Sequence, residues 1–250
     1  LSYAVVREKA DLGISVDPDV DRLAFICENG EPFGEEYTLV SVASYLFERA
    51  AKIAQAEDIP LEEVTYPYAA VSCSNLSSSR ALRDVTEKFG GRYHASAVGE
   101  VNVTTMMRQT NALIGGEGNG GVIYPAIHYG RDAMVGVALF LSNLARKEMK
   151  VSELRQTYPE YHIAKNRIEL SDKAPLIDKI LDELKKIYAS EDVNCVDGVK
   201  ISFEDKRQWV HLRRSNTEPI IRVYSEAPTM EEAEALAGEV ISVAKSIIGG

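Results

Sequence analysis

Apolar and polar residues follow two patterns along the chain, and the first pattern covers about 150 residues. Within it, short strand-like runs alternate with segments of helical periodicity. The strand-like runs are residues 11–17, 22–33, 63–73, 92–99 and 112–116, and the helical segments are residues 2–10, 37–57, 77–91, 100–110 and 131–150. Because strands and helices alternate from residue 37 onward, we predict a layered α/β domain built on a mixed sheet.

The pattern changes after residue 150, where several strands lie between two helices. The expected elements are a linking segment, a strand, a helix, three strands and a closing helix, at residues 151–161, 162–170, 173–189, 198–205, 208–214, 220–227 and 229 onward. The closing helix starts with a capping box formed by Thr229 and Glu232. This order predicts a small antiparallel α+β domain after the α/β domain.

Composition limits the classes of partner. The 250 residues carry a formal net charge of −10, so no general field attracts nucleic acid or an anionic membrane, and we expect neither partner. No apolar run approaches the roughly 20 residues of a membrane span. Cys27, Cys73 and Cys195 are odd in number and far apart, which favours reduced thiols in the cytoplasm over a disulfide framework. The chain begins at Leu1 within a helical pattern, which indicates a fragment of a longer protein.

The glycine loop (residues 116–121, GEGNGG) has the spacing G-x-G-x-x-G at Gly116, Gly118 and Gly121. In a dinucleotide site, such a loop opens a helix whose N-terminus faces the pyrophosphate. Here β-branched residues and Pro125 follow the loop, and no acidic residue stands about 20 positions on to bind a ribose. Glu117 would also repel a pyrophosphate. We therefore expect the glycines to serve another ligand or only a tight turn.

The acidic loop (residues 17–22, DPDVDR) places Asp17, Asp19 and Asp21 directly after a predicted strand. A turning backbone can bring these carboxylates together, and such a cluster repels itself unless a hard cation such as Mg²⁺ or Ca²⁺ neutralises it. An EF-hand is excluded because Arg22 occupies the position that requires glycine. Two other interpretations stay open: a solvated acidic turn, and a phosphatase of the haloacid dehalogenase type with Asp17 as nucleophile.

The arginine loop (residues 213–222) has two arginines, Arg213 and Arg222, on either side of a turn that contains Ser215, Asn216 and Thr217. A guanidinium group binds phosphate through two charge-assisted hydrogen bonds, and small polar residues add short donors. The pattern is suited to phosphate capture. An ordinary hairpin turn with surface arginines also fits these residues.

The three loops together resemble those of the α-D-phosphohexomutases. That family carries a D-[GP]-D-x-D-R magnesium loop, a G-E-x-x-G sugar loop and an R-x-S-[NG]-T-E-P phosphate loop, and this chain has DPDVDR, GEGNGG and RRSNTEP in the same order. The resemblance spans essentially the whole chain. The form GEGNGGVIYP is similar to that of phosphoglucosamine mutases, although the histidine that ends the loop in some family members is Gly121 here.

The resemblance implies a role for each loop. Asp17, Asp19 and Asp21 would bind Mg²⁺, and Arg22 would act as a catalytic residue that neutralises the transferring phosphoryl group. Glu117 and Asn119 would bind sugar hydroxyls. The non-reacting phosphate would be bound by Arg213, Ser215, Asn216, Thr217 and Arg222.

The resemblance also implies an activity. The family member would interconvert hexose 6-phosphate and hexose 1-phosphate, here glucosamine phosphate, through a phosphoserine and a 1,6-bisphosphate. A phosphomannomutase/phosphoglucomutase of the same family and a non-catalytic module that binds sugar phosphates are the alternatives.

The family's T-A-S-H-N-P-like serine motif is absent from the sequence. We therefore expect a C-terminal fragment that lacks the N-terminal domain and is inactive alone. Residues 1–33 would end domain 2, residues 34–150 would form domain 3, and residues 151–250 would form domain 4.

Overall fold

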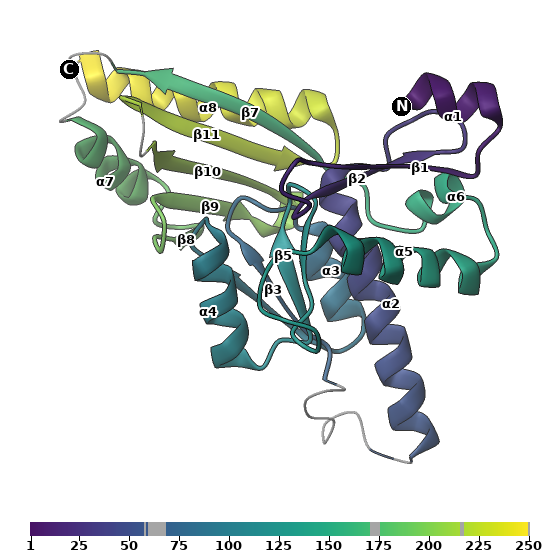
Figure 1. Cartoon of the computed structure of the whole chain (residues 1–250). Helices are drawn as coiled ribbons and strands as arrows, with labels where there is room; N and C mark the ends of the chain where they lie inside the picture. The colour runs from purple at the N-terminus through teal and green to yellow at the C-terminus, as the bar shows by residue number, and fades with distance from the viewer. Residues whose placement is uncertain (58, 60–68, 171–175, 216–217, 250) are drawn as a thin grey trace. The chain divides into compact units, whose positions relative to one another are not determined.

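The computed structural model describes residues 1–57, 59, 69–170, 176–215 and 218–249 (Figure 1). The chain divides into two compact units, Leu1–Pro159 and Glu160–Gly250. The first is an α/β unit and the second an antiparallel α+β unit, which confirms the predicted fold class. The division of the chain into three parts at residues 33 and 150 stays a prediction. Among the described residues, no helix has the length and apolar character that a membrane span requires.

Unit 1 contains a mixed four-stranded sheet in the order β4-β3-β5-β6. Strand β3 is parallel to β4 and β5, and β6 returns antiparallel to β5. The strands of unit 1 are β1 Leu12–Val16, β2 Leu23–Cys27, β3 Val71–Asn75, β4 Arg92–Ser96, β5 Ile114–Glu117 and β6 Gly121–Ile123. The helices are α1 Ser2–Glu8, α2 Glu35–Ala56, α3 Ala81–Lys88, α4 Glu100–Thr110, α5 Ala133–Lys147 and α6 Val151–Gln156.

Helices cover both faces of this sheet. On one face, Cys73 of β3 packs with Val103 and Met107 of α4 in a buried cluster. On the other face, the Ser72 hydroxyl lies 2.6 Å from the Thr86 hydroxyl of α3. The predicted α/β layering therefore holds, and it places the carboxyl ends of the parallel strands β3 and β5 at one edge.

Strand β5 needs its glycines because helix α4 and the backbone of strand β6 approach it closely. A Cβ at Gly115 would lie 2.5 Å from the Met107 sulfur of α4, and one at Gly116 would lie 2.0 Å from the carbonyl oxygen of Gly121. Such distances are too short for any larger residue. The glycine-rich sequence is thus explained first by packing.

Strands β1 and β2 form an antiparallel hairpin with Leu12 opposite Cys27 and Val16 opposite Leu23. The acidic loop connects them, a pairing that we had not predicted. A turn at Asn29 and Gly30 follows β2, where the Cys27 N–H donates to the carbonyl oxygen of Glu31 at 2.8 Å. Beyond this turn, β2 forms one isolated bridge, between Ile26 and Pro32, among the described residues. The main pairing partner of β2 is therefore β1.

The segment expected to be a linker contains the short helix α6. The Lys150 N–H donates to the carboxylate of Glu153 at 2.9 Å, which satisfies one donor at the helix start. The Arg155 Nε donates to the carbonyl oxygen of Phe33 at 3.1 Å, so tertiary contacts stabilise a helix too short to form alone.

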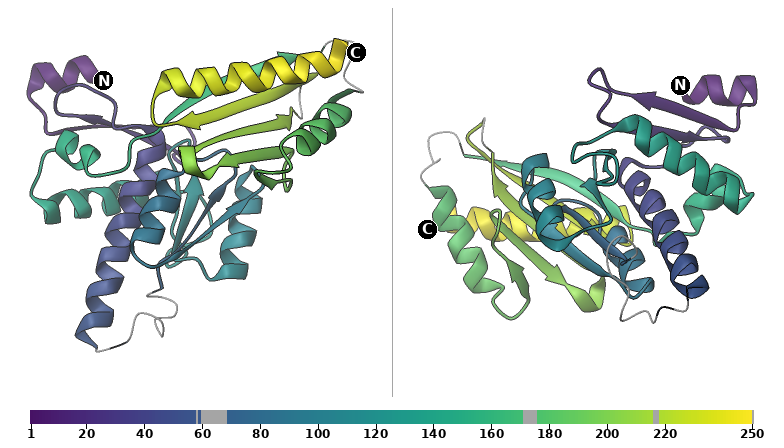
Figure 2. Two further views of the ribbon diagram at one scale, coloured as in Figure 1. Left: turned by 180° about the vertical axis from the view of Figure 1, so that it is seen from behind. Right: turned by 60° about the horizontal axis from the view of Figure 1, so that its bottom comes forward.

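Unit 2 is a five-stranded sheet in the order β7-β11-β10-β9-β8, with each strand antiparallel to its neighbours. Its elements are β7 His162–Glu169, α7 Ile177–Ile187, β8 Asp192–Asn194, β9 Val199–Phe203, the short 3₁₀ helix Glu204–Lys206, β10 Gln208–Arg214, β11 Ile220–Ala227 and α8 Met230–Gly249. Helices α7 and α8 pack against the same face of the sheet around a core that includes Leu212 and Val223 (Figure 2). The predicted capping box is confirmed by hydrogen bonds between Thr229 and Glu232, and the three-residue strand β8 was not predicted.

His211 is buried in unit 2, with 1% of its surface exposed. Its Nε2 donates to the carbonyl oxygen of Asp197 at 2.6 Å. Burial lowers the pKa of His211 to about 4, and the hydrogen bond to Asp197 only partly offsets that effect. The native state therefore keeps the imidazole neutral at pH values where an unfolded chain would protonate it.

We predict that unit 2 loses stability as the pH falls from about 6.5 toward 4. In that window the unfolded state binds a proton that the native state excludes, so the free energy of unfolding falls with pH, by about 2–3 kcal/mol from pH 7 to 4.5. Trp209 is the only tryptophan, so its fluorescence during urea unfolding reports on unit 2. His211→Gln should flatten this pH dependence, whereas His162→Gln, at a half-exposed histidine of the same unit, should leave it unchanged. Equal slopes in wild type and His211→Gln would contradict the prediction.

Candidate functional site

The acidic loop is closed by hydrogen bonds to its own first residue. The Asp17 Oδ1 accepts the backbone N–H groups of Asp21 and Arg22, each at 3.2 Å, and the Arg22 Nε donates to Asp17 Oδ2 at 2.8 Å. Val20 has φ 57°, a left-handed conformation that a β-branched residue rarely adopts. The loop therefore holds a strained turn, as loops at functional sites often do.

The carboxylates of the acidic loop differ in environment. Desolvation alone would raise the pKa of Asp17, but hydrogen bonds from Arg22 and Asp21 outweigh it and lower the pKa to about 2. Desolvation and the neighbouring Asp17 raise the pKa of Asp21, against the attraction of Arg131. Asp19 is exposed at the turn. Asp17 and Asp21 are thus neighbours, while the third predicted ligand stands apart.

The three carboxylates are not gathered around one point. Within the part of the chain that the structure describes, no group of three His, Cys, Asp or Glu side chains is arranged to hold a metal ion. Asp21 Oδ1 is buried, lacks a hydrogen-bond partner among the described residues, and lies 3.6 Å from the Arg22 Nε. This oxygen therefore keeps unused hydrogen-bond acceptor capacity beside its ion-pair contact with Arg22.

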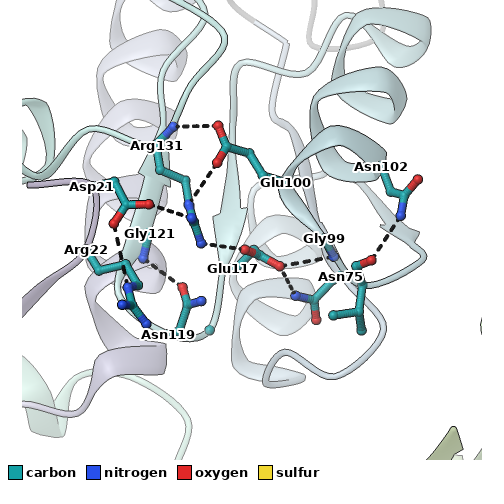
Figure 3. Close-up of polar contacts among 12 residues, drawn as sticks. Asp21, Arg22, Asn75, Gly99, Glu100, Asn102, Glu117, Asn119, Gly121 and Arg131 are labelled. Atoms are coloured by element: carbon teal, nitrogen blue, oxygen red, sulfur yellow. Dashed lines mark hydrogen bonds and ion pairs between the residues drawn. The ribbon is translucent and has the colours of Figure 1, made fainter. Parts of the chain in front are cut away.

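The glycine loop joins β5 to β6 and carries Glu117 inward. This side chain is 7% exposed. Its Oε1 accepts the side-chain amide of Asn75 at 2.8 Å and the N–H of Gly99 at 3.2 Å, and its Oε2 accepts Arg131 Nη1 at 2.8 Å (Figure 3). Asn119 is half-buried, and its Oδ1 accepts the N–H of Gly121 at 3.2 Å.

The acidic and glycine loops lie side by side in unit 1. The N–H of Leu23 donates to the carbonyl oxygen of Gly120 at 3.2 Å, and Arg22 forms a bridge with Gly121. A pocket of about 310 Å³ lies against both loops and is lined by Ser15, Val16, Asp17, Arg22, Leu23, Ala24, Glu35 and Asn119. Four of the predicted site residues, namely Asp17, Asp21, Arg22 and Asn119, are therefore close to one another, with Glu117 behind them.

The glycine loop is not a nucleotide loop in this structure. Gly121 begins strand β6 instead of a helix, so no helix N-terminus faces the loop. The following helix, α5, begins after Asp132, whose carboxylate accepts the N–H of Val135 at 2.9 Å. Asp132 is thus the N-cap of α5.

Asn75, Glu100 and Arg131 also hold this site together, and sequence reasoning missed Asn75 and Arg131. Asn75 ends β3 and Glu117 ends β5, so both lie where the carboxyl ends of parallel strands meet, a place at which ligands often bind. Arg131 stands one residue before the N-cap of α5, a position that fixes its backbone. Asn75 could have been found from its place at the end of a strand, whereas Arg131 carried no local signal in the sequence.

The arginine loop lies in unit 2. Arg213 and Arg222 are directly opposite each other on β10 and β11, and Arg222 is opposite Arg167 on β7. Paired positions place side chains on one face, so three arginines form a row on the face opposite the helices. Like charges directly opposite one another are destabilising unless an anion compensates them, and the sequence had not identified Arg167.

The remaining residues of this loop are partly described. Ser215 is buried, and its N–H donates to the carbonyl oxygen of Ile220 at 3.0 Å, which closes the turn. Asn216 and Thr217, both predicted to bind phosphate, lie outside the described residues. The Arg213 Nε is buried and has no hydrogen-bond partner among the described residues.

Two family models match the chain. The phosphoglucomutase/phosphomannomutase alpha/beta/alpha domain III model matches residues 37–161, and the C-terminal domain model of the same family matches residues 167–243. A "Probable phosphoglucosamine mutase" from Methanopyrus kandleri is 30% identical over 248 residues, which cover 99% of this chain and 51% of that protein. The chain thus spans about half the length of this relative.

Solved structures agree with this assignment at the level of the fold. A phosphoglucomutase/phosphomannomutase family protein from Burkholderia thailandensis superposes with a TM-score of 0.75 at 20% identity, covering 99% of this chain and 49% of the other. Aspergillus fumigatus N-acetylphosphoglucosamine mutase, solved with GlcNAc-6P and magnesium, gives 0.64 at 17% identity, covering 92% and 51%. Together with the two family models, which match most of the chain, these findings show that the chain belongs to the phosphoglucomutase/phosphomannomutase family.

Proposed function

We propose that this chain acts as the carboxyl-terminal half of an α-D-phosphohexomutase that interconverts the 6-phosphate and 1-phosphate of a hexose. The observation that carries the proposal is the joining of the acidic and glycine loops in unit 1. It sets the loop that we assign to phosphoryl transfer beside the loop that we assign to the sugar. The complete polypeptide, as we use the term, is this chain joined to the N-terminal half that its relatives carry.

The row of arginines is suited to the phosphate that does not react. Arg213 and Arg222 lie opposite each other and can each offer a planar fork of donors to phosphate oxygens. Ser215, at the end of β10, adds a hydroxyl donor, and Asn216 and Thr217 complete the loop in sequence. We assign these five residues to the binding of that phosphate.

Glu117 and Asn119 are the residues that we assign to the sugar hydroxyls. Each carboxylate oxygen can accept more than one hydrogen bond, so Glu117 keeps acceptor capacity despite its protein partners. Its orientation is fixed in advance, which lowers the entropy lost when a ligand binds. A mutase must bind its sugar in two orientations. A rigid acceptor serves both if it binds hydroxyls that occupy equivalent positions in the two orientations.

The acidic loop matches Mg²⁺ in its donor chemistry. Mg²⁺ is bound through oxygen ligands and accepts one or two carboxylates together with phosphate oxygens. The Oδ1 of Asp21, which accepts no hydrogen bond among the described residues, is suited to this role. We propose Asp17, Asp19 and Asp21 as the protein ligands. Binding would require Asp17 to leave its hydrogen bond with Arg22 and the exposed side chain of Asp19 to turn inward. A bound Mg²⁺ supplies charge stabilisation for the transferring phosphoryl group.

Arg22 is the residue of this chain that we assign to catalysis. Its guanidinium group is about half exposed beside the pocket and holds Asp17 in place. In phosphoryl transfer, catalysis is mostly positioning and neutralisation of charge on the transferring oxygens, which a guanidinium group can provide. The serine that carries the phosphoryl group lies outside this sequence, and the sugar 1,6-bisphosphate would link the two half-reactions.

Glucosamine phosphate is the substrate that we favour. The support is the GEGNGGVIYP form of the glycine loop and the name of the Methanopyrus kandleri relative. A phosphomannomutase/phosphoglucomutase of the same family is the alternative, because the described contacts do not distinguish the sugar at C2. The three free cysteines suit a reducing compartment, and we place the enzyme in the cytoplasm on that basis.

We predict that the 250-residue chain alone shows no mutase turnover, because the phosphorylated serine is contributed by the other half. A coupled assay with glucosamine 1-phosphate and a hexose bisphosphate activator measures this directly, and the complete polypeptide provides the positive control. Turnover by the chain alone would contradict the proposal. Steady release of inorganic phosphate would instead indicate a phosphatase with Asp17 as nucleophile, and an inactive complete polypeptide would indicate a binding module.

We predict that Arg213→Ala in the complete polypeptide lowers kcat/KM by about 10- to 150-fold, the value of a charge-assisted hydrogen bond. The loss should appear mainly in KM, because the group bound does not change during the reaction, and both reaction directions should suffer alike. Arg213→Lys should fall between, since lysine keeps the charge but not the fork. Arg214→Ala is the matched control, because Arg214 is exposed and lies one position along the same strand. A KM within twofold of wild type for Arg213→Ala would refute the phosphate assignment.

A further inference from the structure

The Arg131 side chain ends among three carboxylates that come from three different elements of unit 1. Its Nη2 lies 2.5 Å from Asp21 Oδ2, its Nη1 lies 2.8 Å from Glu117 Oε2, and its Nε lies 3.0 Å from Glu100 Oε2 (Figure 3). One planar cation thus contacts the acidic loop, the glycine loop and the start of α4. The Arg131 side chain is 19% exposed, so water screens these ion pairs only in part.

The backbone around Arg131 is anchored on both sides. The Arg131 N–H donates to Glu100 Oε1 at 3.3 Å, and the N–H of Asp132 donates to the carbonyl oxygen of Val122 in β6 at 2.8 Å. Asp132 then caps α5, and the N–H of Ala133 donates to the carbonyl oxygen of Val20 at 3.1 Å. The direction in which the guanidinium group can reach is therefore set by the fold.

Gly121 leaves the space that the stem of Arg131 fills. A Cβ at position 121 would lie 2.4 Å from Arg131 Cδ, which real contacts do not allow. The glycine is therefore required by this arginine, since its own backbone does not have a positive φ. The cationic side chain that lies at the end of the glycine loop is therefore that of Arg131, ten positions further along the chain than Gly121.

Arg131 also determines which way Glu117 faces. Oε1 of Glu117 is held by Asn75 and Gly99, while the hydrogen bond to Oε2 among the described residues comes from Arg131. Loss of Arg131 would leave a nearly buried carboxylate held at one oxygen and repelled by Asp21 and Glu100. Such a carboxylate turns away from its charged neighbours or displaces the loop that carries it.

We propose that Arg131 is a positioning residue that fixes the glycine loop against the acidic loop and so orients Glu117 for the sugar. The inference rests on the proposed function, because it concerns the same site. Arg131 acts through Glu117 and Asp21 and need not touch the substrate. A lysine could supply the charge but could not contact three carboxylates in one plane.

The test uses steady-state kinetics of the complete polypeptide and two separate ways of displacing the guanidinium group. Arg131→Ala removes it, and Gly121→Ala pushes it aside without removing any charge. Each should lower kcat/KM by about 10- to 100-fold, mainly through KM, as misplacement of a binding group does. Arg131→Lys should restore part of the loss.

A double-mutant cycle links the two displacements. Gly121→Ala should have little further effect once Arg131 is alanine, because its clash partner is gone and the guanidinium group is already absent. Glu117→Gln should likewise be much less harmful in the Arg131→Ala background than in wild type. Arg155→Ala is the matched control: Arg155 is another half-buried arginine of unit 1, and its Nε bonds the carbonyl oxygen of Phe33. That variant should lower the melting temperature and leave KM unchanged.

The outcomes separate this inference from the function on which it rests. A wild-type polypeptide without mutase turnover overturns the proposed function, and the inference falls with it. Wild-type turnover together with an unchanged KM in both Arg131→Ala and Gly121→Ala overturns the inference alone. Additive effects of Gly121→Ala and Arg131→Ala, or a KM change in Arg155→Ala equal to that of Arg131→Ala, would show that general stability and not positioning is responsible.

Discussion

Charge neutralisation around the acidic and glycine loops is the constraint on which the rest of the site depends. Asp17 and Asp21 lie close together, and Glu117 is nearly buried behind them. Carboxylates held this near each other and away from water are unfavourable unless a cation and hydrogen bonds compensate them. Arg22 compensates Asp17 and Arg131 compensates Asp21 and Glu117, so two guanidinium groups allow two loops distant in sequence to meet.

Much of the fold followed from hydrophobic periodicity, because the long helices and buried strands of both units bury whole faces. The β1–β2 hairpin and α6 could not be predicted in the same way. Helix α6 depends on a partner far along the chain, because the carbonyl oxygen of Phe33 accepts the hydrogen bond of Arg155, and no local pattern predicts such a partner. The hairpin pairs two strands that are neighbours in sequence, but the acidic loop between them carries no standard hairpin-turn signal. The acidic, glycine and arginine loops were identified from spacing and resemblance, since their residue types are unusual for ordinary turns. Arg131 and Arg167 were missed because an isolated arginine carries no local signal, and only strand register and tertiary structure bring each one to its neighbours.

Under our proposal, Glu117 serves both the packing of its loop and the binding of a sugar. Its carboxylate is already held by Asn75, Gly99 and Arg131 within the protein. Such prior fixing lowers the entropy lost on binding and limits the orientations in which a hydroxyl can donate to it. The glycines around it have a matching explanation, because a Cβ at Gly116 or Gly121 would overlap neighbouring atoms. The loop that looked like a nucleotide fingerprint is thus shaped by close packing around an inward-facing acid.

The arginine row in unit 2 presents the opposite problem, an excess of positive charge in a protein with a net charge of −10. Arg213, Arg222 and Arg167 lie on three neighbouring strands at directly paired positions, where like charges destabilise a sheet. Arg167 and Arg222 have acidic neighbours in Glu169 and Glu218, whereas Arg213 keeps a buried Nε without a hydrogen-bond partner among the described residues. A phosphate dianion would supply that partner and relieve the repulsion along the row. The destabilisation of the empty sheet would then add to the affinity for phosphate, because the ligand removes a repulsion as well as forming new bonds. An acidic protein can bind an anion in this way, since short-range donors on a few residues outweigh a distant net charge that salt screens.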